Sequence, residues 1–386
     1  MKQPSPPVLY FHSVAPEQFS DWTLNFLTMG LDRFEAQMQY LQAKGFRAVF
    51  FEEWLEARQG ARPANGKEIC LSFDDGLLDN WVYAFPMAKK YGLKLTLFVC
   101  PELVDPRDIV RPNLDDLWAG RVPASELEGL GNLSWAELRS MQASGYADVQ
   151  SHTMSHAKYP VSDRLRGFYY GGFEGFYPCL NTYPPERKPF YMNDPGFKNR
   201  LPAGTPLFEE SSAVTARKHT INPHFFEEAA ALARGCELEH PDSRLAYEKA
   251  VRQLHDRYRT GGVLVSDIET DAEYLQRLEY EIAQSKQIIE TQLGKPVRFL
   301  CWPHGDNSHQ AHILARQAGY AATTAGKMTD EAEQPDRIPR IGTDWNIGPW
   351  WMRRKLDYKL SSHFRQQPYY SLWLANEYKN RILQRI

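Results

Sequence analysis

Two adjacent carboxylates, Asp74 and Asp75, follow an apolar run and precede Gly76. Side chains alternate along a strand, so neighbouring carboxylates can take two different roles only where the chain turns. Gly76 permits such a turn because glycine tolerates backbone conformations that other residues avoid. Taken alone, Asp-Asp-Gly is also typical of an ordinary turn without chemistry.

Two histidines, His152 and His156, stand four residues apart after a second strand-like run. Both imidazoles can therefore converge on one point. A catalytic Zn²⁺ takes about three protein ligands and keeps one position for water, and two histidines with one aspartate meet that need. Alone, the pair is weak support, because many such pairs merely share a helix face.

A third segment, Trp302-Pro-His-Gly305, again follows a strand-like run. An aromatic residue, a proline and a glycine at the end of a strand can place a backbone N–H beside a site. The alternative is a plain turn between a strand and a helix.

The elements that must position these segments alternate between short apolar strands and helical patterns, which indicates parallel strands joined by right-handed crossovers. Residues 1–157 form the first part of this α/β pattern, and residues 271–386 form the second part and end in a helical tail. Strands are predicted at 8–11, 47–51, 68–73, 94–99, 148–151, 297–302, 320–323 and 337–341, and helices at 32–44, 78–90, 134–143, 271–293 and 309–318.

Residues 158–270 behave differently from the two flanking parts. Residues 167–208 are dense in aromatic residues, proline and glycine without a sustained period, whereas 223–260 are helical in pattern. We expect this stretch to be an insertion from one barrel loop that caps the active site. The alternative is that its aromatic residues form a small separate core or a subunit contact.

Composition excludes several classes of function. The chain has 386 residues and a net charge of −3, so neither nucleic acid nor an anionic membrane is expected as the main partner. Its five scattered cysteines form no CxxC pair, which fits a reducing compartment. No signal-peptide stretch and no apolar run of about 20 residues is evident, and the expectation is a cytoplasmic protein without a transmembrane segment.

Together and in this order, the segments resemble the polysaccharide deacetylase group, carbohydrate esterase family four, also called the NodB-homology domain. The resemblance covers most of the chain outside residues 158–270. It rests on the runs Phe73–Gly76, Ala84–Gly92, Thr96–Val99, Leu133–Trp135, Ser151–His156, Ile289–Gly294 and Trp302–Gly305. The start of the chain, Leu9-Tyr-Phe-His-Ser-Val14, is similar to the poly-N-acetylglucosamine deacetylase branch.

The resemblance implies a distorted (β/α)7 barrel with the site at the C-terminal ends of its strands. It implies that Asp74 is the general base and that Asp75, His152 and His156 hold a divalent metal, expected to be Zn²⁺. The backbone N–H of His304 would help to bind the oxyanion.

Substrate contacts follow from the same resemblance. Trp302, Pro303 and His304 are expected to contact the substrate. Asp344-Trp345 is similar to a further family motif in which the tryptophan lines the pocket, so Trp345 joins this set.

The chain departs from the family where a proton must reach the leaving amine. Typical members carry an arginine two residues before the proline of the third motif to orient the base, and Cys301 stands there instead. Arg340 could replace it, although a surface cation is the simpler interpretation. The general acid could be His12, which we favour, then His304, and last His363; a structural histidine is the alternative for His12.

The predicted function is metal-dependent removal of an N-acetyl group from a sugar or glycan precursor, with release of acetate. One alternative keeps the fold and the metal but hydrolyses a small cyclic amide or imide. Another is a glycan-binding protein that has lost turnover. The paired carboxylates argue against the second alternative, because binding alone needs no spare carboxylate.

Overall fold

The computed structural model describes residues 5–19, 22–63, 65–325, 334–343 and 347–383. Its centre is a parallel sheet in which eight strands run in the order β14-β13-β12-β7-β6-β5-β1-β15, and β4 pairs with β5 beside this path. The strands are β1 (Val8–Phe11), β4 (Arg47–Ala48), β5 (Glu68–Phe73), β6 (Leu95–Val99), β7 (Ala147–Ser151), β12 (Phe299–Leu300), β13 (Ala322–Thr324), β14 (Arg337–Ile338) and β15 (Ile341–Gly342).

The two ends of this sheet are close together in the chain. β14 and β15 occupy opposite edges, yet only Pro339 and Arg340 separate them. So short a link spans at most about 10 Å, so the edges must approach each other and the sheet must curl into a barrel. The predicted strand 337–341 is thus one strand that Pro339 and Arg340 interrupt at the seam, the place where the two edges of the sheet meet. When β14 and β15 are counted as one strand, the eight strands become the expected seven. The predicted α/β fold, a distorted barrel of parallel strands, is confirmed.

Apolar packing on both faces holds the barrel together, as parallel sheets require. Every residue of β5 is buried, and its Phe73 stacks on Phe11 of β1 with ring centroids 5.0 Å apart. Phe34 meets Phe11 edge to face from outside the sheet. The surrounding helices are α1 (Leu31–Ala43), α2 (Phe51–Gln59), α3 (Phe85–Lys90), α4 (Leu114–Trp118), α5 (Trp135–Ala143), α9 (Asp271–Leu278), α10 (Ser285–Leu293), α11 (His309–Gln317), α12 (Pro349–His363) and α13 (Tyr369–Leu383).

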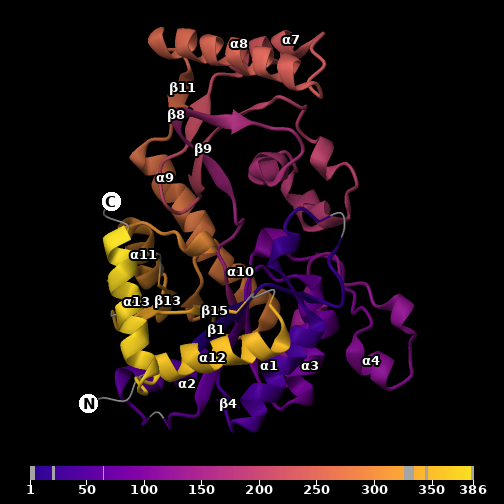
Figure 1. The fold of residues 1–386 in the computed structure, drawn as a ribbon, viewed down its shortest axis with the longest axis vertical. Coiled ribbons are helices and arrows are strands. Elements are labelled where there is room, and N and C mark those ends of the chain that lie inside the picture. The colour runs from indigo at the N-terminus through magenta and orange to yellow at the C-terminus, as the bar shows by residue number, and fades with distance from the viewer. Residues whose placement is uncertain (1–4, 20–21, 64, 326–333, 344–346, 384–386) are drawn as a thin grey trace.

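Residues 158–270 lie beyond one end of the barrel, at the top of Figure 1. They contain the antiparallel pairs β8 with β9 and β10 with β11, and their own apolar cluster around Phe225 and Val251. A second aromatic cluster, which includes Phe176 and Tyr191, packs against Cys100 of the barrel. The elements are β8 (Lys158–Phe168), β9 (Pro206–Ser212), β10 (His219–Ile221), β11 (Val265–Ile268), α6 (Phe176–Leu180), α7 (Pro223–Ala233) and α8 (Pro241–Thr260).

Several boundaries differ from the sequence-based expectation. The predicted strand 47–51 stops at Ala48, because the Glu53 carboxylate accepts the N–H of Phe50 and starts α2. A short parallel pair, β2 (Ser13–Ala15) with β3 (Thr28–Gly30), was not predicted. In the described parts of the chain, no helix is both long and apolar enough to cross a membrane.

Candidate active site

The two adjacent carboxylates leave the end of β5 in different directions. Asp75 has a φ of 73° and Gly76 a φ of 70°, so the chain turns in a left-handed conformation directly after Asp74. A side chain at Gly76 would also meet Val99, because a Cβ placed on this glycine would lie 3.1 Å from Cγ1 of Val99. The turn therefore separates the roles of Asp74 and Asp75, and only glycine suits its third position.

Asp75 faces two imidazoles. Its Oδ1 lies 3.2 Å from Nε2 of His152 and 3.3 Å from Nε2 of His156. Among the described residues, this buried Oδ1 has no hydrogen-bond donor. Nδ1 of His152 donates to the carbonyl of Cys301 at 2.9 Å, so Nε2 is the ring nitrogen that faces the cluster. The arrangement is one in which a cation can bind three converging ligands.

The pKa shifts of Asp75 and His156 favour the forms of these two groups that bind metals. Burial raises the pKa of Asp75, but the neighbouring His156 and His152 outweigh this and bring it well below its usual range. Burial lowers the pKa of His156 to about 4, so its ring is neutral at ordinary pH. An ionised carboxylate beside a neutral imidazole is a suitable donor set for a divalent cation.

Strained backbone and one buried glutamate hold the histidine loop. Thr153 and His156 have positive φ values of 67° and 54°. Glu281 accepts the backbone N–H groups of Met154 and Ser155, each at 3.1 Å. Glu281 belongs to a π-helical segment, Glu279–Gln284, between α9 and α10. Such segments recur at functional sites. The helical pattern predicted for 271–293 did not indicate that Glu281 would hold the loop of His152 and His156.

Asp74 is the second carboxylate, and Arg340 holds it. One guanidinium nitrogen of Arg340, Nη1, donates to both oxygens of Asp74, at 2.7 and 2.8 Å. The Arg340 side chain is only 11% exposed and lies over the ring of Tyr10. The interpretation of Arg340 as a surface cation is therefore wrong: the chain delivers it into the barrel from the seam between β14 and β15.

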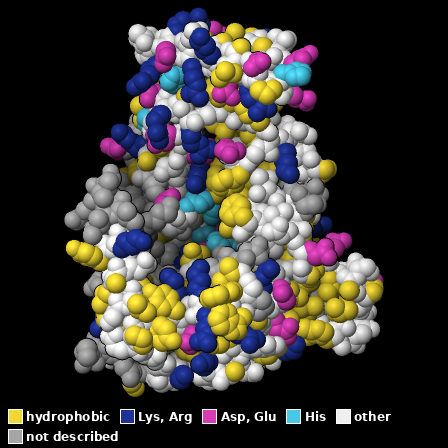
Figure 2. Space-filling view, viewed as in Figure 1, with side chains coloured by type: hydrophobic (Ala, Val, Ile, Leu, Met, Phe, Trp, Pro, Cys, Tyr) yellow, Lys and Arg dark blue, Asp and Glu magenta, His cyan; other side chains and the backbone are white. Residues whose placement is uncertain are grey.

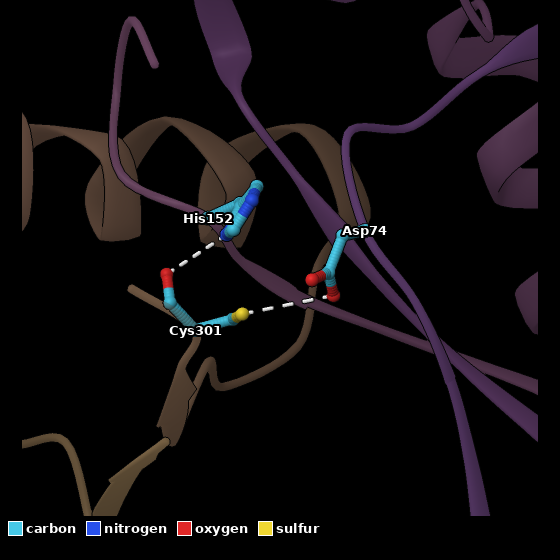
Figure 3. Close-up of side chains that lie close together, drawn as sticks. All are labelled: Asp74, His152 and Cys301. Atoms are coloured by element: carbon cyan, nitrogen blue, oxygen red, sulfur yellow. Dashed lines mark hydrogen bonds between the residues drawn. The ribbon is translucent and has the colours of Figure 1, made fainter. Parts of the chain in front are cut away.

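Cys301 and His12 complete the surroundings of Asp74. The thiol of Cys301 donates to Oδ1 of Asp74 at 3.6 Å, and the carbonyl of the same cysteine holds His152 (Figure 3). Nε2 of His12 lies 3.9 Å from Oδ2 of Asp74. Burial alone would raise the pKa of Asp74, but Arg340 and two nearby histidines hold it below its usual range. The carboxylate is therefore ionised and able to accept a proton.

His12 is itself held in place from a second π-helical segment, Asn80–Ala84. Nδ2 of Asn80 donates to the backbone carbonyl of His12 at 2.8 Å. This support follows the Asp-Asp-Gly turn closely in sequence, yet the helical pattern predicted for 78–90 gave no sign of it.

A pocket of about 700 Å³ connects the carboxylates, the histidines and residues 158–270. Figure 2 shows histidine side chains in a hollow near the middle of one face, with hydrophobic side chains beside them. His304 lines this pocket with a positive φ of 61°, and its ring lies 4.5 Å from that of His156. Lys158 and Tyr177 line it from the insertion, and neither was singled out from the sequence.

Several predicted residues lie elsewhere. Trp302 is fully buried in the barrel core, and neither Trp302 nor Pro303 belongs to the pocket wall. The chain turns into the pocket only at His304. His363 contacts the N-terminal segment instead, with Nε2 2.7 Å from the carbonyl of Ser5. Asp344 and Trp345 lie outside the described residues.

A family model described as polysaccharide deacetylase matches residues 61–167. That stretch includes Asp74, Asp75, His152 and His156. Residues 61–167 thus carry the sequence pattern of polysaccharide deacetylases. The chain's resemblance to the NodB-homology group, inferred from the motifs, is confirmed.

Part of the chain is similar to a curated protein, YxkH of Bacillus subtilis (strain 168), which carries the name of a polysaccharide deacetylase. The two are 34% identical over 94 residues, which are 24% of this chain and 31% of YxkH. The matched region thus spans about a third of the length of that relative.

Solved structures of similar fold cover more of the chain. A de-N-acetylase from Aggregatibacter actinomycetemcomitans is 18% identical, with coverage of 90% of this chain and 98% of that one and a TM-score of 0.53. The BpsB deacetylase domain from Bordetella bronchiseptica is 17% identical, with coverage of 88% and 95% and a TM-score of 0.49. At this identity the first likeness shows a shared fold, and it extends the comparison beyond residues 61–167.

Proposed function

We propose that this protein is a metal-dependent hydrolase that removes the N-acetyl group from an N-acetylated sugar of a glycan and releases acetate. One observation carries the proposal: two adjacent carboxylates are divided between two tasks. Asp75 converges with His152 and His156, whereas Asp74 stands beside them in an ion pair with Arg340. A site for binding alone would need only the first of these arrangements.

The donor set fits a divalent cation, with Zn²⁺ as the expected metal. Oδ1 of Asp75 is buried without a donor among the described residues and faces two imidazole nitrogens, so it lacks the partner that a cation would supply. Three ligands of this kind leave a coordination position for water. When bound, the metal would lower the pKa of water and polarise the acetyl carbonyl.

Asp74 is proposed as the general base. Its carboxylate is not part of the Asp75 cluster, and Arg340 keeps it ionised and fixed in orientation. A positioned carboxylate of this kind can accept the proton that the attacking water loses. Arg340 thus takes the place of the arginine that Cys301 replaces.

His12 is proposed as the acid that protonates the leaving amine. It lies on the pocket wall 3.9 Å from Asp74, whereas His363 lies away from the pocket. His304 suits this task less well, because burial brings the pKa of His304 far below its usual range and leaves the ring without a proton to donate. We expect the substitution His12→Gln to lower kcat about 100-fold with metal content unchanged. Wild-type kcat in this variant would exclude His12 as the acid.

His304 is proposed to contribute through its backbone. Its left-handed conformation turns the chain at the pocket wall, and by the family resemblance its N–H would bind the oxyanion.

The size of the pocket favours a glycan as the substrate. A volume of about 700 Å³ exceeds what a small cyclic amide or imide would fill. The Asp74–Arg340 pair also weakens the alternative of a glycan-binding protein without turnover, because it restores the base orientation that is missing from the third motif.

Metal content and acetate release together test the proposal. We expect the wild type to contain about one divalent cation per chain, and Asp75→Ala to lose both the metal and acetate release from N-acetylated oligosaccharides. Asp74→Asn should keep the metal but lower kcat by roughly 100-fold to 10,000-fold. Normal metal content in Asp75→Ala would refute the ligand assignment, and normal turnover in Asp74→Asn would refute the base.

A further inference from the structure

A second cavity, of about 690 Å³, lies within residues 158–270, between β9, α7 and α8. Its wall consists mainly of aliphatic, proline and aromatic side chains. Representative members are Pro160, Leu207, Phe208, Phe226, Ala230 and Leu238. Cavities of this volume are the usual size of small-molecule sites.

The polar side chains in this wall are largely occupied by the protein itself. Nδ2 of Asn181 donates to the carbonyl of Lys158 at 2.8 Å, and the hydroxyl of Thr205 donates to the carbonyl of Pro202 at 2.7 Å. The hydroxyl of Tyr247 donates to the carbonyl of Gly204 at 2.8 Å.

A sugar in this cavity would lose hydrogen bonds to water and find few replacements, apart from those that the side chains of Glu210 and Arg234 could offer. A hydrocarbon chain loses nothing of this kind and gains from burial of its apolar surface. The wall therefore selects an apolar ligand.

The cavity adjoins the catalytic pocket. Lys158 lines the catalytic pocket and Pro160 lines the cavity, and both lie on one face of β8 about 7 Å apart along the strand. On α6, Tyr177 lines the catalytic pocket and the next residue, Pro178, lines the cavity. The two pockets are therefore neighbours along β8 and α6, and an elongated ligand that occupies both would lie across these elements.

We propose that the cavity holds the hydrocarbon chain of an amphipathic glycolipid whose N-acetylated sugar occupies the catalytic pocket. The proposal rests on the proposed function and names its substrate class. The wall includes the exposed residues Ala203 and Ala230, so the cavity reaches the surface and admits a chain longer than itself.

Binding of dodecyl β-D-glucoside, which has no acetyl group, measures the cavity separately from turnover. With the full chain and below the critical micelle concentration, we expect binding at least tenfold tighter than that of methyl β-D-glucoside. Ala230→Trp fills the cavity and should remove this difference, whereas Ala231→Trp, on the same helix but outside the wall, should keep it. Ala233→Phe, also in the wall, is a second filling variant should Ala230→Trp fold poorly.

Acetate release from dodecyl and methyl N-acetyl-β-D-glucosaminide measures the substrate class. We expect kcat/KM to be at least tenfold higher for the dodecyl glycoside in the wild type and in Ala231→Trp, and about equal for both glycosides in Ala230→Trp. Acetate release without any advantage of the dodecyl chain would overturn this proposal and leave the deacetylation intact. Chain binding that depends on Ala230, without acetate release from either glycoside, would overturn the glycolipid substrate together with the proposed function.

Discussion

The barrel end and the insertion build the same pocket by opposite means. At the barrel end, charged groups are buried in fixed pairs, and the backbone adopts left-handed conformations at Asp75, His156 and His304. In the insertion, the walls are apolar and the charged pairs are mostly exposed, as between Arg164 and Glu209. Strain and buried charge occur where groups must be held for chemistry, whereas apolar packing suffices where a surface must only fit a ligand.

Among the variants that test this comparison, the largest effect is expected for Arg340→Ala, which removes the charge that pairs with Asp74. Misplacement of a catalytic group by about 1 Å can cost about 100-fold in rate, and we expect a loss of that size in kcat. Arg340 holds the pKa of Asp74 low, so the variant should also lose activity at a higher pH as the solution is acidified.

Arg298→Ala is the matched control, because Arg298 pairs with Glu52 on the exposed outside of the barrel. If Arg340→Ala keeps the wild-type kcat and loses activity at the wild-type pH on acidification, the ion pair does not serve catalysis.

A smaller effect, and in KM rather than kcat, is expected for Lys158→Ala in the insertion wall. Lys158 lies over the ring of Tyr177 and lines the same pocket as Asp74 and Asp75. Loss of one polar contact to a substrate corresponds to about fivefold in KM. Lys249→Ala, at an exposed position of α8, is the control. A fall in kcat with constant KM in Lys158→Ala would contradict the assignment of substrate contact to residues 158–270 and of chemistry to the barrel end.

The smallest effect on turnover, but a clear one on stability, is expected for Asp79→Asn. Burial raises the pKa of Asp79 to about 7, although Ser13 and Asn80 donate hydrogen bonds to it. Only the folded state holds this proton between about pH 4 and 7, so the free energy of unfolding falls as the pH rises through that window, by roughly 1.4 kcal/mol per pH unit.

In Asp79→Asn this contribution should be absent, which denaturant unfolding at several pH values measures. Asp108→Asn, at a side chain that is 85% exposed, should keep the wild-type slope. Equal slopes in the wild type and Asp79→Asn would refute the raised pKa.

The site residues that could be predicted from the sequence are those whose position depends only on a short motif at the end of a single strand. Asp74 and Asp75 at the end of β5, and His152 and His156 after β7, lie where a short motif fixes both the strand and its turn. The side chain of Trp302, by contrast, lies in the barrel core, two residues before the chain reaches the pocket at His304.

Arg340 could not be placed in the same way, because its position depends on which strands are neighbours. β15 pairs with β1, which in turn pairs with β5, and only this order brings residue 340 to the carboxylate of residue 74. Lys158 and Tyr177 were missed for a related reason: the aromatic-rich insertion has no period from which its inward side can be read.

Because Arg340 lies in the interruption between β14 and β15, the Asp74–Arg340 ion pair depends on the barrel staying closed. Arg340 sits in the two-residue link that joins the opposite edges of the sheet, so any opening of these edges withdraws the guanidinium from Asp74. Folded proteins open locally at a lower cost in free energy than global unfolding requires. Turnover should therefore cease when the seam opens, before the rest of the barrel unfolds.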